Sequence, residues 1–254
     1  MPVNHKDIKL KPPENNPDRP GLFDGLDEKS LELILGTSQL QTFDAGRLLI
    51  QQGDVPEYLY YVVEGVVKTY RSDSDGKEAT IRILRAGETC MDAVIFMGGA
   101  SPIAVQVVEA AKILMIPEIF IRKYVLANPQ FSTNLLRIVT KHYKSALQQL
   151  EGVITKTPLQ RLGYYLLKLH LEKGHDALDM DLPFKKSLIA NQLGMTPESF
   201  SRALKEMKSF GIDIDQEHIK MKDAYALCHF CDTDTAFICT DADKQGCDTC
   251  PHKN

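Results

Sequence analysis

The pattern of apolar and polar positions changes along the chain and predicts a different kind of structure in each part. Residues 40–116 contain short runs of β-branched and aromatic residues separated by glycines, which predicts an all-β barrel or roll with tight turns. From about Pro129 to Ile154, apolar residues recur at heptad-like gaps, which predicts a long helix with an apolar seam. Residues 157–173 predict another amphipathic helix, and residues 188–211 predict two short helices joined by a tight turn.

The strand-like runs of the first half are short, and residues 72–76 (SDSDG) between two of them have the composition of a turn. Periodicity alone leaves the topology of these strands open. The predicted strands are 58–63, 66–71, 79–84, 104–110 and 112–117.

The second helix of the 188–211 pair has a well-marked start and two distinct faces. Thr196 is placed to be its N-cap and Pro197 its first helical residue, and the turn before it falls at Leu193-Gly194. The apolar face consists of Phe200, Ala203, Leu204 and Met207. The polar face consists of Glu198, Ser201, Arg202 and Lys205.

This polar face has the chemistry to read DNA, because a helix fits the major groove, where a carboxylate accepts from cytosine and an arginine donates to guanine. Two amphipathic helices around a glycine turn also occur in folds that bind no nucleic acid. Residues 212–223 alternate apolar and polar positions around a turn near Gln216-Glu217, which predicts a β-hairpin. A hairpin there would be the wing that accompanies such a helix pair and favours DNA binding.

Charge and composition refine this picture. The net charge of the chain is −4, which by itself disfavours a nucleic-acid partner, but this charge is unevenly distributed along the sequence. Residues 223–254 hold six acids and two lysines, whereas residues 155–222 hold eleven Lys/Arg and nine Asp/Glu and are the one net-basic part. No apolar run is long enough to span a membrane, and residues 1–20 lack the apolar core of a signal peptide, so a cytoplasmic protein is expected.

The apolar seam of the long helix suggests pairing with a second copy of itself, with Leu136, Tyr143, Leu147 and Leu150 as its main residues. The alternative is that the helix only packs on the β domain. We favour a homodimer, because a two-fold DNA reader needs two recognition helices.

The order of β-roll, long helix and winged helix-turn-helix resembles the Crp/Fnr superfamily of transcription regulators over residues 21–222. The most specific pieces are residues 43–88, residues 157–169 (TPLQRLGYYLLKL) and the helix pair. The resemblance implies an α+β fold whose β-roll (jelly roll) is of the cyclic-nucleotide-binding type. It also implies a non-enzymatic, homodimeric regulator with double-stranded operator DNA and RNA polymerase as partners.

The expected domain boundaries combine the sequence patterns with this resemblance. They are a flexible tail (1–20), an effector β-roll (21–128), a dimerisation helix (129–154), a winged helix-turn-helix (155–222) and a cysteine-rich tail (223–254).

Within the resemblance, the effector pocket would contain Gly87, Glu88 and Ser101. Members that bind cyclic AMP hold its phosphate with a Gly-Glu pair and a later Arg-Ser pair. Here Gly87-Glu88 is present, but the later pair aligns with Ser101-Pro102, which lacks the arginine and one backbone N–H. Cyclic AMP is therefore not the expected effector.

Residues 88–99 instead resemble the Dnr branch, whose members respond to nitric oxide and use haem. No clear haem ligand stands out, because His142 on the long helix has the setting of a surface or packing residue. The expected signal is a redox change, nitric oxide or a small molecule.

The DNA-reading residues match the Fnr and Dnr branches, which use Glu-x-x-Ser-Arg on the recognition helix. Residues 198–202 repeat this motif, which implies a TTGAT half-site repeated as an inverted pair. Arg202 would contact guanine, Glu198 cytosine, and Ser201 a base or the backbone. Further DNA-contacting candidates are Thr196 and Ser199, with Lys205, Lys208, Lys185 and Lys186 nearer to phosphates.

The chain ends in a cysteine-rich segment that departs from this family. Cys228, Cys231, Cys247 and Cys250 form C-x2-C-x15-C-x2-C, which is metal-site spacing. A structural zinc site is the first interpretation, with Cys239 as an alternative ligand. An iron–sulfur cluster is the second, and a redox-switched disulfide set is the third.

Other classes of protein fit these features less well. A cyclic-nucleotide-type regulatory module acting through protein contacts, or an iron–sulfur redox protein, would leave the Glu-x-x-Ser-Arg helix unexplained. The remaining cysteine, Cys90, lies in the β domain and is interpreted as a small buried residue.

Overall fold

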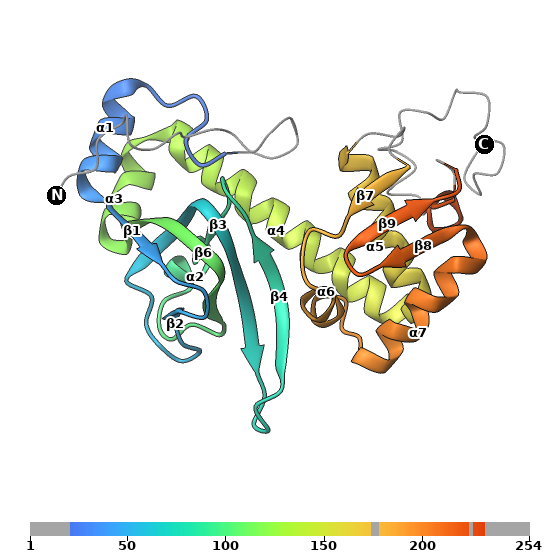
Figure 1. Ribbon diagram of the computed structural model, residues 1–254. Coiled ribbons are helices and arrows are strands. Elements are labelled where there is room, and N and C mark those ends of the chain that lie inside the picture. Colours follow the sequence, from blue (N-terminus) through green and yellow to red (C-terminus); the bar gives the residue numbers. More distant parts are fainter. Residues whose placement is uncertain (1–20, 174–177, 224–225, 232–254) are drawn as a thin grey trace. The chain divides into compact units, whose positions relative to one another are not determined.

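The computed structural model divides into two compact units, residues 1–146 and 147–254, each with a hydrophobic core of its own (Figure 1). The structure describes residues 21–173, 178–223 and 226–231. The tail expected to be flexible, residues 1–20, lies outside the described residues, and so do Cys239, Cys247 and Cys250.

The first unit is built on an antiparallel sheet of order β1-β6-β3-β4, in which β2 also pairs with β6 and β5 with β3. Its strands are β1 (Gln39–Phe43), β2 (Leu48–Ile50), β3 (Tyr58–Ser72), β4 (Glu78–Leu84), β5 (Thr89–Cys90) and β6 (Ala104–Pro117). This sheet confirms the predicted β-roll. Its inward-facing residues, among them Leu59, Val105 and Ile113, are fully buried.

The two central strands are longer than the sequence predicted. Each of β3 and β6 absorbs two of the predicted short strands, so the prediction of separate strands was wrong. The reason is visible at Gly65, which has a φ of +87° and lies where the register between β3 and β6 shifts. A β-bulge of this kind bends a strand without ending it.

In the described part of the first unit, residues 21–146, there are four helices, one of which continues into the second unit. They are α1 (Glu28–Thr37), α2 (Val94–Met97), α3 (Glu118–Ala127) and α4 (Pro129–Thr155). Asp27 caps α1 by accepting a hydrogen bond from the Ser30 N–H at 2.7 Å. The long helix α4 matches the predicted span to within one residue and continues past Ala146 into the second unit.

The second unit contains the predicted helix pair and wing. Its helices are α5 (Pro158–Lys173), α6 (Lys186–Gln192), α7 (Pro197–Met207) and the 3-10 turns η2 (Lys208–Phe210) and η3 (Cys228–Phe230). Its strands are β7 (Asp179–Asp181), β8 (Ile212–Asp215) and β9 (His218–Met221). The wing turn falls at Gln216, as predicted. Strand β7 adds a third strand to this sheet, and it was not predicted because it is too short to show a periodic pattern.

The core of the second unit extends beyond the boundary expected at residue 222. Ala226, Leu227 and Phe230 are buried and belong to the same cluster as the helices. The first residues of the cysteine-rich segment are therefore part of this domain. Among the described residues, no helix is both long enough and apolar enough to cross a membrane.

Gly65→Ala is expected to lower the free energy of unfolding by at least about 2 kcal/mol more than Gly76→Ala, because it would force two backbones apart. A Cβ at Gly65 would lie 2.3 Å from the Ala110 carbonyl oxygen. Gly76 also has a positive φ, +77°, but its added Cβ would meet nothing within 4 Å. Urea unfolding followed by circular dichroism measures the difference, and equal losses in the two variants would contradict it.

Candidate nucleic-acid interface

Helix α7 begins as its sequence predicts. Thr196 is the N-cap in an extended conformation, and its hydroxyl accepts a hydrogen bond from the Ser199 N–H at 3.2 Å. Pro197 occupies the first turn, where a missing N–H costs nothing because that group has no partner within the helix. The start and direction of the helix are thereby fixed by local chemistry.

The two faces of α7 lie in opposite environments. Phe200, Ala203 and Met207 are at most 3% exposed and pack in the core of the second unit. The other face is open to solvent. It presents Thr196, Glu198, Ser201, Arg202 and Lys205 as exposed residues, with Ser199 half-buried.

The pKa of the Glu198 carboxyl is lowered from its ordinary value. Its own backbone N–H and the Thr196 hydroxyl donate hydrogen bonds that lower its pKa, and the positive charge of Arg202 one turn later adds to this effect. An ionised carboxylate can only accept hydrogen bonds, whereas a guanidinium can only donate them. Neighbouring positions of this face therefore offer opposite hydrogen-bonding character.

The turn between α6 and α7 is held by a residue that the sequence analysis missed. Arg161 on α5 donates from Nη1 to the carbonyl oxygens of Leu193, at 2.8 Å, and Gly194, at 3.3 Å. Gly194 has a φ of +61°, which glycine adopts without strain. No sequence signal separates Arg161 from a surface arginine, because its partners are backbone groups far along the chain.

Two basic side chains lie side by side in the sequence at the start of α6. Lys185 is exposed and Lys186 half-buried there. The hairpin β8-β9 exposes three acids, Asp213, Asp215 and Glu217, and one lysine, Lys220. This excess of acids makes the helix pair a more favourable neighbour for a phosphate backbone than the hairpin.

Lys208 forms an ion pair within its own domain. Its Nζ lies 3.0 Å from Oδ1 of Asp213, and both side chains are largely exposed. The wing acid therefore competes with a phosphate for this lysine.

The residues expected to form the effector pocket make hydrogen bonds to backbone groups of the β-roll itself. The buried Gly87 donates its N–H to the Val62 carbonyl at 2.8 Å, and Glu88 accepts from the Arg85 N–H at 2.9 Å. Ser101 is 2% exposed, and its hydroxyl donates to the Ile103 carbonyl at 2.7 Å. A hollow of about 390 Å³ in this unit lies elsewhere, between residues 55–58, α2 and the start of α3.

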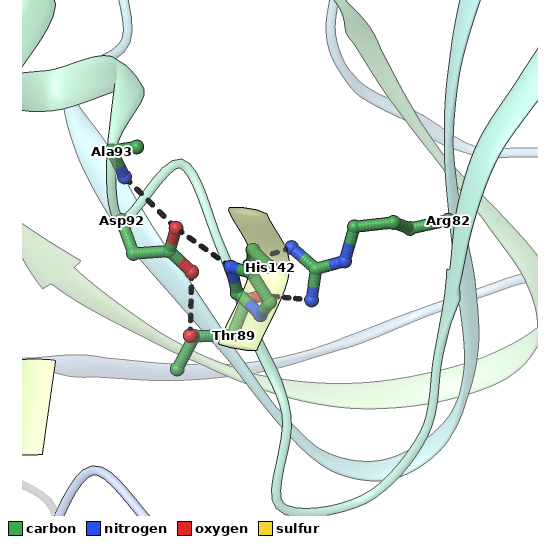
Figure 2. Close-up of polar contacts among 5 residues, drawn as sticks. All are labelled: Arg82, Thr89, Asp92, Ala93 and His142. Atoms are coloured by element: carbon green, nitrogen blue, oxygen red, sulfur yellow. Dashed lines mark hydrogen bonds and ion pairs between the residues drawn. The ribbon is translucent and has the colours of Figure 1, made fainter. Parts of the chain in front are cut away.

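A polar cluster joins the β-roll to α4. Figure 2 shows Asp92 accepting hydrogen bonds from the Thr89 hydroxyl at 2.7 Å and from the Ala93 N–H at 2.9 Å. Its Oδ1 also lies 3.2 Å from Nδ1 of His142, which projects from α4. Arg82 of β4 reaches the same His142 nitrogen at 3.1 Å and donates to the Thr89 carbonyl at 3.2 Å.

The Nδ1 atom of His142 cannot serve both partners at once. Arg82 only donates hydrogen bonds, so that contact requires Nδ1 to be without a proton. The Asp92 carboxylate only accepts, so its contact requires Nδ1 to carry one. The tautomer of His142 therefore decides which of the two contacts is a hydrogen bond.

Burial and charge have opposite effects on the acids and thiols near this cluster. Burial alone would raise the pKa of Asp92, but the hydrogen bond and charge of His142, the charge of Arg82 and the Thr89 hydroxyl together lower it. Cys90 is 1% exposed, and burial raises the pKa of its thiol to about 12. A thiol of that acidity is protonated at neutral pH and a poor nucleophile, which agrees with its interpretation as a packing residue.

The seam residues of α4 are exposed within the chain. Leu136 is 67% exposed and Tyr143 66%, with Leu147 at 47% and Leu150 at 57%. Large apolar side chains with this exposure are typical of a surface that another molecule covers.

Comparison with known proteins identifies the chain. A model of the cyclic nucleotide-binding domain matches residues 40–128, and a model of the Crp-like helix-turn-helix domain matches residues 160–230. The chain belongs to the Crp/Fnr family of transcription regulators. The predicted membership of this family, based on the sequence motifs, is thereby confirmed.

Individual Crp/Fnr relatives cover most of the chain at modest identity. The probable transcriptional regulator flp of Lacticaseibacillus casei is 27% identical over 73% of this chain and 84% of its own length. The transcriptional activator protein FnrA of Stutzerimonas stutzeri is 24% identical over 72% of this chain and 76% of its own. The solved structure of a CooA mutant from Carboxydothermus hydrogenoformans has the same fold, with a TM-score of 0.70 at 21% identity over 87% of this chain and 98% of its own.

The Crp/Fnr match accounts for the β-roll and the helix pair but not for a metal site. Among residues 21–173, 178–223 and 226–231, no three His, Cys, Asp or Glu side chains gather as a metal cluster. Cys228 and Cys231 are described and half-buried. The other expected ligands, Cys239, Cys247 and Cys250, lie outside the described residues.

Asp92→Asn is expected to lower the free energy of unfolding by about 1–3 kcal/mol at neutral pH, because the buried side chain loses its charge and one of its two acceptor oxygens. The pKa of Asp92 in the folded state is lowered from its ordinary value of 3.8, so its contribution to stability is complete above that value. The contribution is lost as the pH falls through the lower folded-state pKa, and the wild type and the variant should then converge.

Urea unfolding at a series of pH values between about 7 and 2 tests this expectation. Asp75→Asn, in the exposed turn between β3 and β4, is the control for a general loss of negative charge. A difference between wild type and Asp92→Asn that stayed constant down to the lowest pH would show that Asp92 is not held ionised by this cluster.

Proposed function

We propose that this Crp/Fnr regulator binds a palindromic TTGAT-like operator as a homodimer, with α7 as the recognition helix. The observation that carries the proposal is the pair of opposite faces of α7. Its apolar face is buried in the domain core, and the Glu-x-x-Ser-Arg residues of the other face are exposed. A helix so placed can enter the major groove without any rearrangement of its own domain.

The chemistry of the exposed face supports the proposed half-site. Arg202 would donate to the O6 and N7 atoms of guanine, and the ionised Glu198 would accept from the amino group of cytosine. The Thr196 hydroxyl is engaged in capping the helix, so its contribution would be to hold Glu198 and Ser199 in place. Lys185 and Lys205, both exposed, would contact phosphates and set affinity rather than sequence preference.

The proposed dimer uses the exposed seam of α4. A two-fold operator requires two copies of α7 about one DNA turn apart, and a paired α4 supplies a two-fold axis. The exposed Leu136, Tyr143, Leu147 and Leu150 would be buried in this pairing. Ile154, 73% exposed, extends the seam toward the end of the helix.

The proposed signal is a redox change, nitric oxide or a small molecule rather than cyclic AMP. Ser101 and Pro102 offer no cation for a phosphate, and the Ser101 hydroxyl is already bound to its own loop. The His142 contacts with Arg82 and Asp92 connect the segment after β5 to α4. A change in that segment would therefore alter the contacts of the proposed dimer helix. A cytoplasmic location and contact with RNA polymerase complete the proposal.

Arg202→Ala is expected to reduce the preference for a TTGAT-N4-ATCAA duplex over a scrambled duplex by about tenfold or more, because the loss of a bidentate base contact costs about 1–3 kcal/mol. Lys185→Ala is the matched control, since a lost phosphate contact should weaken binding to both duplexes alike. Mobility shifts at several salt concentrations measure both variants. If Arg202→Ala bound the operator as tightly as wild type, this assignment of α7 would be wrong.

Leu150→Glu is expected to weaken dimerisation at least about a hundredfold, because the two-fold axis would bring a buried carboxylate from each copy into the seam. Leu126→Glu is the control, since Leu126 is 90% exposed on α3 and outside the seam. Sedimentation velocity at micromolar concentration reads the outcome. Leu150→Glu and Leu126→Glu sedimenting alike as dimers would place the interface elsewhere.

A further inference from the structure

Two cysteines of the second unit lie at the two ends of a single turn. The 3-10 turn η3 runs from Cys228 to Phe230, and the Cys231 N–H donates to the Cys228 carbonyl oxygen at 3.1 Å. A 3-10 turn has three residues per turn, so side chains three positions apart project from the same side. A turn closed by this hydrogen bond holds its end Cα atoms within about 7 Å, and a disulfide spans about 4.4–6.8 Å between such atoms. The two thiols can therefore join without unfolding the turn.

The exposure of these two thiols distinguishes them from Cys90, the third cysteine among the described residues. Cys228 and Cys231 are half-buried, so small solutes reach them. Cys90 is 1% exposed, and burial raises the pKa of its thiol to about 12. Because the thiolate is the form that reacts with an oxidant, Cys90 is protected both by its protonation and by its burial. The pair in the turn lacks the protection of complete burial.

The chemistry open to this pair needs no other side chain. In the part of the chain that the structure describes, no three His, Cys, Asp or Glu side chains gather as a metal cluster. Two neighbouring thiols are sufficient for oxidation to a disulfide. In a reducing compartment such as the cytoplasm, disulfides are usually transient redox switches rather than structural links.

Phe230, between the two cysteines, lies directly against the backbone of α5. A Cβ added at Gly163 of α5 would lie 2.2 Å from Cγ of the Phe230 ring, so no larger residue fits there. Glycine destabilises the interior of a helix relative to alanine. Its presence in the middle of α5 is explained by this close approach, which leaves Phe230 only 8% exposed.

The same turn contacts the end of the proposed recognition helix. The Phe230 and Phe210 rings lie 5.1 Å apart, and the His229 ring lies 5.6 Å from that of Phe210. Phe210 is the last residue of η2, which follows α7 without interruption. A movement of Phe230 therefore changes the packing at the end of α7.

Disulfide formation would move Phe230 in one direction. It brings the two sulfur atoms to about 2.05 Å, well inside the contact distance of separate thiols, so the turn has to tighten. Phe230 cannot move deeper, because its ring already lies against the α5 backbone at Gly163. Tightening therefore draws the ring outward, and Phe210 loses a packing partner.

We propose that a peroxide joins Cys228 and Cys231 in a reversible disulfide, and that this bond weakens operator binding by drawing Phe230 away from the end of α7. The inference assigns a site to the redox signal of the proposed function. Its effect on DNA rests on that function, whereas the formation of the disulfide does not.

The oxidation is a two-electron reaction in two steps. The thiolate of one cysteine attacks an oxygen of hydrogen peroxide, the O–O bond breaks, and a sulfenic acid forms as hydroxide leaves. The thiolate of the other cysteine attacks the sulfenic sulfur, so that the S–S bond forms and a second hydroxide leaves. The two thiol protons convert both hydroxides to water. A thiol reductant restores the dithiol by exchange.

The chemical arm of the test uses the full-length protein in reduced form, before and after treatment with hydrogen peroxide. Remaining thiols are alkylated, the protein is digested with trypsin and chymotrypsin, and mass spectrometry identifies the linked peptides. The expected product contains a bond between Cys228 and Cys231 that dithiothreitol breaks. Cys90→Ala should form the same bond, whereas Cys228→Ser should not.

Three results of this arm overturn the disulfide. Both thiols could stay fully open to alkylation after peroxide, or either could pair with Cys239, Cys247 or Cys250 instead. A metal, detected by elemental analysis of the reduced protein, could also shield both thiols from alkylation. These measurements are made on the wild type and do not depend on the folding of a variant.

The DNA arm compares mobility shifts of the reduced and oxidised protein with the TTGAT-N4-ATCAA duplex. Oxidation is expected to raise the Kd of the wild type about 5- to 150-fold, the usual range for coupled sites, and dithiothreitol should reverse the rise. Cys228→Ser should show no such rise, and circular dichroism checks that its fold survives.

A second pair of variants tests the route through the aromatic contact. Phe210→Leu keeps an apolar side chain but removes the ring contact, so the disulfide should still form and the rise in Kd should fall to about threefold or less. Phe184→Leu changes another half-buried phenylalanine of the same core and should respond as the wild type does.

The outcomes of the DNA arm separate the two proposals. A disulfide that forms completely but leaves the wild-type Kd unchanged overturns the regulatory role, and a full response in Phe210→Leu overturns the proposed route. A protein that forms the disulfide but shows no operator preference in either redox state overturns the DNA-binding function and leaves the chemical result intact.

Discussion

The burial of one face of α7 is the constraint on which the rest of this protein depends. Phe200, Ala203 and Met207 enter the core of the second unit, and this packing decides which residues remain outside. A rotation of α7 about its axis would expose these apolar side chains and bury Glu198 and Arg202 without partners, at a cost of several kcal/mol. The same hydrophobic contacts that stabilise the domain therefore orient the groups that would read bases.

The rest of the domain restrains this helix at both ends. At its start, Arg161 binds the carbonyl oxygens of the preceding turn, and Thr196 caps the first turn. At its end, Phe210 packs against Phe230. A helix held in this way enters a groove with little loss of conformational freedom, which is a condition for selective binding.

The sequence predicted those parts of the fold whose causes are local. The cap at Thr196, the turn at Gly194, the wing and the length of α4 follow from nearby residues and were predicted correctly. The continuous strands β3 and β6 were missed because the bulge at Gly65 depends on pairing between distant strands. The contacts of Arg161, and the cluster of Asp92 with His142, were missed for the same reason.

The two units offer different ways for a signal to reach the DNA. In the first unit, His142 links α4 to Arg82 and Asp92 through one ring nitrogen, which can form a hydrogen bond with only one of them at a time. In the second unit, the contact between Phe230 and Phe210 lies within one core. An aromatic pair contributes about 0.5–1.5 kcal/mol, which approaches the coupling free energy of about 1–3 kcal/mol that separates typical active and inactive states. A change at Phe230 would therefore reach the end of α7 through a contact within this domain.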